Sequence, residues 1–439
     1  MPDENRRSAT ARLASLRALL THARERAGLD IGFVLWDGSR VPADLPDGAL
    51  AIRIADEGAV AALLRKPNID TLANLWTSGR LDLRNGTLFD LVDRKPRVRT
   101  KDILRSLDKG LAIRTLARFL FVPRGGPWPL ENVSATPVAD GSEDANRDNV
   151  QYHYDVSNAF YALFLDPEMV YTCAYFHDWA DDLAAAQRNK LDMSCRRLRL
   201  KPGETLLDIG CGWGAFICHA AQHYGVRAHG VTLAQKQYDL ARERIARLGL
   251  QDRVTLELRD YTKVDRTFDK IASIGMFEQV GIDNHAEYFR TIHRLLKPDG
   301  LYLHHAISRP AKRDDKSFRK RRPEFAALTR YIFPGGELDH LGMTIANFER
   351  HGFEVHDVEA WREHYQRTCR MWHDRLLANS EAAIAEIGAV KTRLWLVYLA
   401  ACSIAFQRGT VGIFQTLVSK RKRGASGLPP TRADLYRSY

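Results

Sequence analysis

A glycine-rich segment in the middle of the chain has the residue types and spacing of a ligand-binding loop. It reads LLDIGCGWG from Leu206 to Gly214, follows a predicted strand and opens a predicted helix. Glycine at alternate positions lets the backbone turn sharply and approach a ligand, and the N-terminus of the next helix can hold a carboxylate or phosphate. The spacing is GxGxG, so neither the dinucleotide pattern GxGxxG nor the P-loop pattern GxxxxGKS fits. The alternative is a plain glycine turn between a strand and a helix.

The residues around the loop complete a nucleotide-binding pattern with one departure. Asp208 precedes the glycines, and an aspartate followed by GxGxG resembles motif I of class I S-adenosylmethionine-dependent methyltransferases. The loop would hold the amino-acid end of that cofactor. The second predicted strand would normally end in an acid for the ribose hydroxyls, but it runs into GVTLAQKQ (230–237) without one. Hydroxyl and amide groups would have to replace the carboxylate.

Several separated motifs resemble those of the cyclopropane fatty acid synthases, a family that includes the mycolic acid cyclopropane synthases. In chain order they are VQYHYDVSN (150–158), DP (166–167), YTCAYF (171–176), LLDIGCGWG, GVTLAQKQ, FEQVG (277–281), YIFPGG (331–336) and YLAACSIAF (398–406). The resemblance covers roughly residues 148–420. It implies an α/β fold of the class I methyltransferase type, Rossmann-like with a mainly parallel seven-stranded sheet. The N-terminal part is more weakly similar to the lipid-associated accessory domain of the longer, phospholipid-using members.

The resemblance implies a reaction on lipids. A methyl group passes from S-adenosylmethionine to a cis double bond of a phospholipid acyl chain, a carbocation forms, and proton loss closes a cyclopropane ring. An alkene is a poor nucleophile that needs close alignment with the methyl donor, and the cation must be kept from water. A close variant would divert the same cation to a methyl- or methylene-branched chain, and the sequence leaves both products open.

The proton acceptor implied by the resemblance is a bound bicarbonate ion. Carried over by motif, its site consists of Cys173, Glu278, His305, Ile307 and Tyr365, with main-chain groups contributing at Cys173 and Ile307. Cys173, Glu278, His305 and Tyr365 also have ordinary structural interpretations: respectively a buried thiol, a cap of the next segment, a core histidine and a helix-surface aromatic. Cys402 is a further candidate by resemblance, but its apolar helix offers nothing that would lower the pKa of its thiol, so a structural role is favoured.

The resemblance also supplies the predicted cofactor-binding residues. They are Tyr154, Tyr171, Thr172, Leu206, Leu207, Asp208, Ile209, Gly210, Cys211, Gly212, Trp213, Gly214, Thr232, Leu233, Gln235, Gln237, Asp260 and Tyr261. His153 and Tyr154 are expected to close over the cofactor, and Tyr261 to contact its adenine. No metal ligands are predicted, because the six cysteines are scattered and form no CxxC pair.

Elements that would position these residues alternate along the C-terminal two thirds of the chain. Predicted strands at 204–210, 226–233, 253–260, 268–277 and 301–308 are separated by helices at 213–224, 234–249 and 284–297, which favours a parallel sheet. Residues 361–408 are expected to be mostly helical, with a last strand at 409–420. A small α+β domain is predicted over 1–122, with a helix at 9–27, strands at 31–36, 49–54 and 81–92, and a helix at about 101–121. The Pro/Gly-rich segment 123–149 is predicted to be a linker to the catalytic domain at 150–439, which carries a substrate-side insert near 309–340.

Composition and charge limit the classes of partner that the protein is expected to bind. The 439 residues are 45% hydrophobic and 27% charged, as in ordinary globular proteins. The net charge of +11 is concentrated in residues 309–330 (nine basic, three acidic) and 419–439 (six basic, one acidic). A localised basic face indicates an anionic partner, and we expect anionic phospholipid at a membrane surface. The alternative is that these charges form an ordinary solvated surface that helps solubility.

Rival functions and location follow from the same observations. A nucleic-acid methyltransferase could use the basic face, although neither an [ND]PPY motif nor a Pro-Cys dipeptide occurs. A lipid-binding protein on a degenerate methyltransferase fold is the third hypothesis. The longest near-apolar run, 395–406, is too short to span a bilayer, and the polar start lacks a secretory signal. We therefore expect a cytoplasmic protein on the inner face of the membrane, and by resemblance a homodimer.

Overall fold

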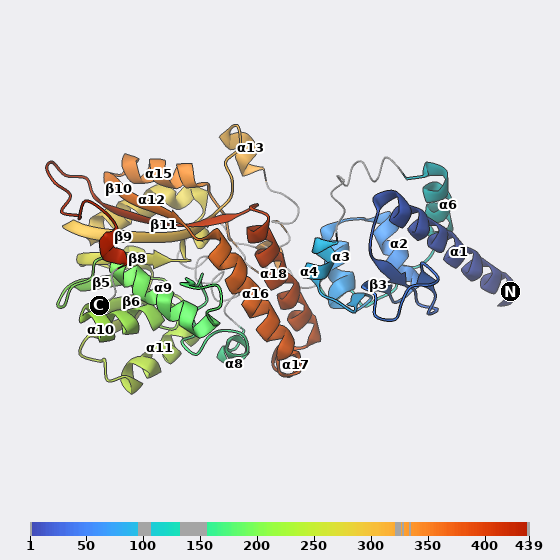
Figure 1. Ribbon diagram of the computed structural model, residues 1–439, viewed down its shortest axis with the longest axis horizontal. Coiled ribbons are helices and arrows are strands. Elements are labelled where there is room, and N and C mark those ends of the chain that lie inside the picture. Colours follow the sequence, from blue (N-terminus) through green and yellow to red (C-terminus); the bar gives the residue numbers. More distant parts are fainter. Residues whose placement is uncertain are drawn as a thin grey trace. The chain divides into compact units, whose positions relative to one another are not determined.

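The computed structural model describes residues 2–94, 107–131, 156–320, 326, 329–332 and 335–436, without the side chains of residues 2–6. Its chain divides into a small unit, Met1–Ser134 with Ala389–Ala400, and a large unit, Ala135–Gly388 with Ala401–Tyr439. Figure 1 labels their helices and strands. The sequence prediction placed all of 150–439 in one domain, whereas here the first part of a C-terminal helix belongs to the small unit.

The large unit is built on a seven-stranded sheet in the order β10-β11-β9-β8-β5-β6-β7. The strands are β5 Thr205–Ile209, β6 Arg227–Thr232, β7 Val254–Leu258, β8 Phe268–Ile274, β9 Leu296–Ser308, β10 Phe353–Ala360 and β11 Gly412–Lys420. β7, β6, β5, β8 and β9 are parallel, while β11 is antiparallel to both β9 and β10. The predicted class I methyltransferase fold, with its mainly parallel seven-stranded sheet, is confirmed. The strand order reverses beside β5, which is where open α/β sheets bind their ligands.

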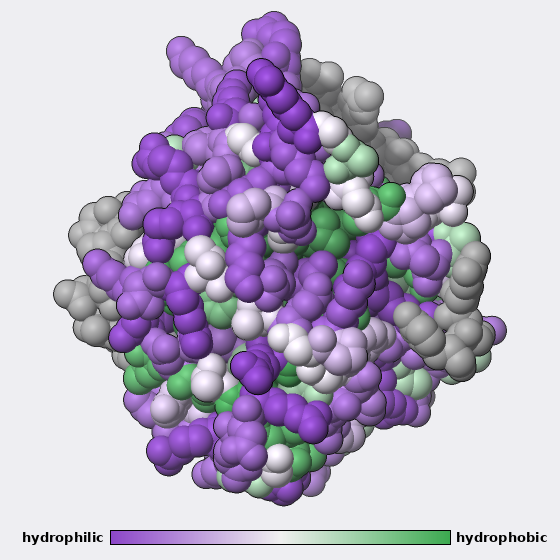
Figure 2. Space-filling model, turned by 90° about the vertical axis from the view of Figure 1, so that its left-hand side faces the viewer, coloured by the Kyte–Doolittle hydropathy of each residue, from purple (hydrophilic) through white to green (hydrophobic). Residues whose placement is uncertain are grey.

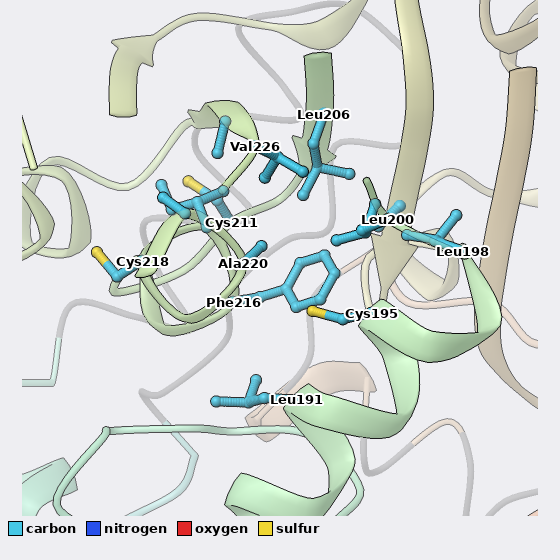
Figure 3. Close-up of a cluster of buried hydrophobic side chains, with 14 of the residues drawn as sticks. Leu191, Cys195, Leu198, Leu200, Leu206, Cys211, Phe216, Cys218, Ala220 and Val226 are labelled. Atoms are coloured by element: carbon cyan, nitrogen blue, oxygen red, sulfur yellow. The ribbon is translucent and has the colours of Figure 1, made fainter. Parts of the chain in front are cut away.

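Helices cover both faces of this sheet (Figure 1). One face carries α9 Leu183–Arg197, α10 Ala215–Tyr224 and α11 Gln235–Arg247, and the other carries α12 His285–Leu295 and α15 Leu341–Arg350. The remaining helices are α8 Asn158–Ala162, α13 Asp315–Arg319, α16 Arg362–Ala378, α17 Ser380–Ile387 and α18 Ala389–Gln407, with short 3-10 turns η1 Tyr261–Lys263, η2 Phe277–Gln279, η3 Ile282–Asn284 and η4 Ala433–Leu435. In Figure 3, Phe216 of α10 points toward Cys195 of α9, and Leu206 of β5 lies among the same apolar side chains.

The small unit contains a four-stranded sheet in the order β2-β1-β3-β4. Its strands are β1 Gly32–Val34, β2 Arg40–Val41, β3 Ala51–Ile54 and β4 Leu81–Arg84, and its helices are α1 Pro2–Ala27, α2 Glu57–Arg65, α3 Ile69–Thr77, α4 Leu88–Asp93 and α6 Lys109–Phe119. Part of the predicted strand 81–92 is helix α4. There Thr87 caps the helix and Asp90 returns the bond to the Thr87 amide, and this capping box outweighs the apolar pattern.

One further segment of the small unit differs from expectation, and a predicted helix is found. Within the predicted linker, Leu130 is 3% exposed and the Arg124 carbonyl accepts a 2.8 Å hydrogen bond from Arg80, so residues 123–131 pack onto this unit; residues 132–149 lie outside the described residues. The predicted helix at about 101–121 is observed as α6, and residues 101–106 are likewise outside the described set.

Helix α18 corrects the expectation that no segment could span a membrane. Among the described helices, it alone is long and apolar enough to do so by length and composition. Of its apolar window, 33% is buried inside the protein. Its first part is tied to the small unit by Arg393, which bonds Asp82 at 2.9 Å and the Trp76 carbonyl at 2.7 Å.

Candidate active site

The glycine loop connects β5 to α10 in a conformation that requires glycine. The φ angles of Gly210, Gly212 and Gly214 are +78°, +53° and +79°. Amides of Gly210 and Cys211 both donate to the Val231 carbonyl at 3.0 Å, which fixes the loop against β6. A Cβ atom on Gly212 would meet no atom within 4 Å, so this position faces open space at the wall of a cavity.

That cavity, about 300 Å³ in volume, lies beyond the carboxyl ends of β5, β6 and β8. The predicted cofactor residues on its wall are Tyr171, Thr172, Asp208, Ile209, Gly210, Cys211, Gly212, Trp213, Thr232, Leu233, Gln237, Asp260 and Tyr261. Four others lie off the wall: Leu206 and Leu207 are buried core residues of β5, Gly214 caps α10, and Gln235 bonds Asp239 at 2.9 Å. His153 and Tyr154 lie outside the described residues.

The end of β6 carries polar groups in place of the missing acid. The Thr232 hydroxyl donates to Gln237 Oε1 at 3.1 Å, and Asp260 follows the next strand, 4% exposed. Tyr261 lies beside Asp260 and packs edge-on against Tyr288, with ring centroids 5.8 Å apart. A hydroxyl, an amide, a carboxylate and an aromatic face therefore line one end of the cavity, which suits a nucleoside.

Sequence reasoning missed a buried lysine at the opposite end. Lys190 of α9 lines the cavity, is 2% exposed, and donates from Nζ to the Thr172 hydroxyl at 2.9 Å. Burial lowers the pKa of Lys190 to about 8 and raises that of Asp208 to about 7, and each charge partly offsets the burial of the other. The available signal was a lone lysine within a helix that otherwise packs against the sheet. Other wall residues outside the prediction include Met276, Gln279 and Val280, which adjoin or belong to FEQVG.

Glu278 and His305 come together at the ends of β8 and β9. Glu278 lies in η2, and its Oε1 accepts a 2.6 Å hydrogen bond from the amide of Ile307. His305 and Ile307 are two residues apart on β9, so their side chains share a face of the strand. Within the described residues, Glu278 Oε2 and both ring nitrogens of His305 are buried without a hydrogen-bond partner. Such groups need a polar ligand or water.

The electrostatics of this pair suit proton chemistry. Burial raises the pKa of Glu278 to about 7. Burial holds the pKa of His305 well below its ordinary value, and the Lys190 cation lowers it further, so the imidazole is neutral near pH 7. Burial likewise keeps Cys173 a thiol, because its pKa lies well above 9.0.

Cys173 and Tyr365 reach the same region from other elements. The Cys173 thiol approaches the Trp361 carbonyl at 3.8 Å, and the Trp361 ring packs edge-on against His305 at 5.0 Å. Tyr365 of α16 packs against Trp372 and Phe406, and its pKa is raised mainly by burial, with smaller contributions that include the charge of Glu278. The five predicted residues are thus connected through Trp361, the Ile307 amide and the electrostatic effects of Glu278 and Cys173 on Tyr365, and none of them lines the cavity itself.

Two other residues, the histidine next to His305 on β9 and the candidate Cys402, lie elsewhere. His304 turns to the other face of β9, where its Nδ1 lies 3.0 Å from the Tyr302 hydroxyl and its ring packs edge-on against Phe277. It is a core histidine, which favours His305 as the functional one. Cys402 lies on α18 near Cys369, whose pKa it helps to raise, and it is not on the cavity wall.

The two basic segments differ in how far they are neutralised. Lys312, Lys316 and Lys320 on and around α13 are exposed, whereas Arg319 pairs with Asp283 at 2.8 Å. Arg321 and Arg322 lie outside the described residues. In the C-terminal segment, Lys422 pairs with Asp299 and Arg432 with Asp357. The face in Figure 2 is mainly hydrophilic, with hydrophobic residues interspersed.

Comparison with known proteins decides the family. Residues 141–416 match the family described as mycolic acid cyclopropane synthetase. The chain belongs to this family. It is 36% identical over 427 residues to a "Probable fatty acid methyltransferase" of Pseudomonas putida, covering 96% of this chain and 100% of that protein. It is 37% identical to the cyclopropane-fatty-acyl-phospholipid synthase of Escherichia coli (strain K12) over 61% of this chain and 66% of that protein.

Solved structures agree with this membership. The cyclopropane synthase MmaA2 from Mycobacterium tuberculosis is 32% identical with a TM-score of 0.59, over 62% of this chain and 98% of that one. The mycolic acid cyclopropane synthase CmaA1, solved with SAH and CTAB, is 34% identical with the same TM-score and coverage. The chain is therefore a methyltransferase of the cyclopropane synthase family that uses S-adenosylmethionine, and its activity is methyl transfer to lipids.

Proposed function

We propose that this enzyme cyclopropanates cis double bonds in phospholipid acyl chains at a membrane surface on the cytoplasmic side. The observation that carries the proposal is that buried polar atoms of Glu278 and His305 have no hydrogen-bond partner among the described residues, and that Glu278 lies between the cavity-wall residues Met276 and Gln279. Ring closure requires removal of a proton from the newly added methyl group. A dry region with a carboxylate and a neutral imidazole is suited to hold a proton acceptor there.

The chain's groups fit both small molecules that the reaction needs. The glycine loop, Lys190 with Thr172, and the polar end at Thr232 and Asp260 would hold S-adenosylmethionine, which supplies an electrophilic methyl group. Glu278 Oε2 and the His305 nitrogens would hold bicarbonate, which has both a hydroxyl donor and acceptor oxygens and would supply the proton acceptor. Glu278 is fixed for this by the Ile307 amide, and His305 by the edge of Trp361.

A second candidate has its own support. The Pseudomonas putida relative, which matches this chain along its whole length, is named a probable fatty acid methyltransferase. The corresponding activity would leave a methyl- or methylene-branched chain in place of a ring. The two reactions share methyl transfer and differ in the fate of the proton.

The experiment is to incubate the full-length protein with S-adenosylmethionine, bicarbonate and vesicles of cis-unsaturated anionic phospholipid. Mass spectrometry of the acyl chains measures the one-carbon gain, and proton NMR identifies the product. High-field ring protons support cyclopropanation, while a one-carbon gain without them assigns branching. His305→Ala should lose turnover by about a hundredfold or more, with Cys402→Ala as the matched control. No gain with bound cofactor would refute both candidates.

A further inference from the structure

Helix α6 of the small unit, together with the two residues that follow it, carries an apolar ridge of large exposed side chains. Ile113, Leu116, Leu120 and Phe121 are 65%, 38%, 47% and 90% exposed. At about 100° per residue, positions 113, 116 and 120 fall within about 60° of one another on the helix. A run of large exposed apolar side chains on one helix face marks an interaction site more often than chance.

Buried residues on another side of α6 anchor the helix to the small unit and fix which side chains remain exposed. Thr115 and Phe119 are 0% and 1% exposed and pack into the small unit, where the Thr115 hydroxyl meets that of Ser15 at 2.9 Å. Asp108 caps the helix start by accepting from the Leu111 amide. The helix is therefore anchored by one face, and its ridge points away from the core.

Charge around the ridge indicates what it meets. Over residues 107–131 there are four basic residues and two acids, a balance of +2, and Arg124 pairs with Glu131 at 2.5 Å. Lys109 and Arg114 are exposed, and Arg118 donates to the main-chain carbonyl of Ala11 at 3.1 Å, with no acidic partner among the described residues. A helix with an apolar ridge and flanking cations matches the interface of an anionic bilayer, where apolar residues enter the acyl boundary and basic residues meet the headgroups.

We propose that α6 is the element that docks this enzyme on anionic membrane, with Phe121 and Ile113 inserted below the headgroups. The inference rests on the proposed lipid function and adds the surface that delivers the enzyme to its substrate. The proposal gives the membrane-docking role to α6 of the small unit, in addition to the exposed lysines around α13.

The test measures binding of full-length protein to vesicles without S-adenosylmethionine, so it is independent of turnover. Sedimentation with cis-unsaturated phosphatidylcholine containing phosphatidylglycerol compares wild type with Ile113→Ser/Phe121→Ser. Each lost apolar contact should weaken binding by about tenfold. Leu248→Ser/Leu258→Ser is the matched control, since those residues are 36% and 45% exposed on the large unit and should bind as wild type does. Circular dichroism verifies folding of both variants.

A second measurement tests directly whether the side chain at position 121 enters the bilayer. The emission that Phe121→Trp adds to that of wild type should shift to the blue on vesicle addition and be quenched by brominated acyl chains. Wild-type affinity of the Ile113/Phe121 variant, or an added emission that does not shift on sedimented protein, would overturn the proposal. So would conversion of a wild-type dimer to a monomer by the double-serine variant with vesicle binding intact, because the ridge would then be a contact with a second copy. Methyl transfer to detergent-dispersed lipid separately tests the proposed function.

Discussion

Replacing Glu278 by glutamine tests the electrostatic description of the site in one substitution. Oε2 of this half-buried side chain is enclosed by the protein, and burial raises the pKa of Glu278 to about 7 against an ordinary 4.5. Each pH unit between those values corresponds to about 1.4 kcal/mol, which gives roughly 3 kcal/mol in total. Glutamine has the same shape, stays neutral, and can still accept the Ile307 hydrogen bond through its oxygen.

The sign of the effect follows from proton linkage. Between about pH 4.5 and pH 7 the folded protein holds a proton on Glu278 that the unfolded chain has released, so this group lowers the free energy of unfolding as the pH rises. The glutamine variant lacks this fall in the free energy of unfolding, because its side chain does not titrate. The variant should match wild type near pH 4.5 and exceed it by roughly 3 kcal/mol near pH 8. Glu278 also helps to raise the pKa of Asp339, and its removal acts in the same direction.

Urea unfolding followed by fluorescence, with wild type and variant compared at each pH, measures the difference. Turnover should fall by about a hundredfold or more, because the group that faces the proton acceptor is lost, while affinity for S-adenosylmethionine is kept. A stability difference that does not change with pH would refute the assignment of a desolvated carboxyl, whatever happens to activity.

Three further substitutions examine the rest of the site. Lys190→Met removes the hydrogen bond to Thr172 and leaves Asp208 without its cation; calorimetry should show affinity for S-adenosylmethionine reduced about tenfold, and an unchanged value would remove Lys190 from the cofactor site. Gly212→Val places a side chain in the cavity and strains a φ of +53°, so cofactor binding should be lost while the fold survives; normal affinity would contradict the loop assignment. Cys402→Ser should keep turnover within about twofold, since the thiol is away from the cavity, and a large loss would revive a catalytic role.

The parts of the fold that local sequence patterns determine could be predicted from the sequence, whereas the parts that depend on tertiary contacts could not. The glycine loop and the strand-helix alternation from β5 to β9 follow from local patterns, and the structure contains them. Strand β10 was not predicted because FEVHDVEA is rich in acids, which strands disfavour. Its Asp357 and Glu359 are there because Arg197, buried on α9, bonds both across the unit.

The candidate site was likewise predictable only where its residues belong to contiguous motifs. The predicted residues on the cavity wall lie in contiguous motifs, whose chemistry can be recognised without a structure. Lys190 was missed because its partner, Thr172, is brought to it by tertiary packing. Likewise, the choice between His304 and His305 depends on which face of β9 each occupies, and that is fixed only when the sheet forms.

The place of β11 between β9 and β10 has a consequence for biosynthesis. His305 pairs with Gln415, and Ile307 with Ile413, so the strand that carries these two candidate residues gains its second neighbour only when β11 exists. Between Ser308 and Gly412 the ribosome must translate about 100 residues, which takes roughly 5–20 s. During that interval β9 is an open edge with unpaired backbone groups, a form prone to aggregation. Slow translation of this stretch would prolong the exposure, and chaperones that cover nascent strand edges should matter for the yield of active enzyme.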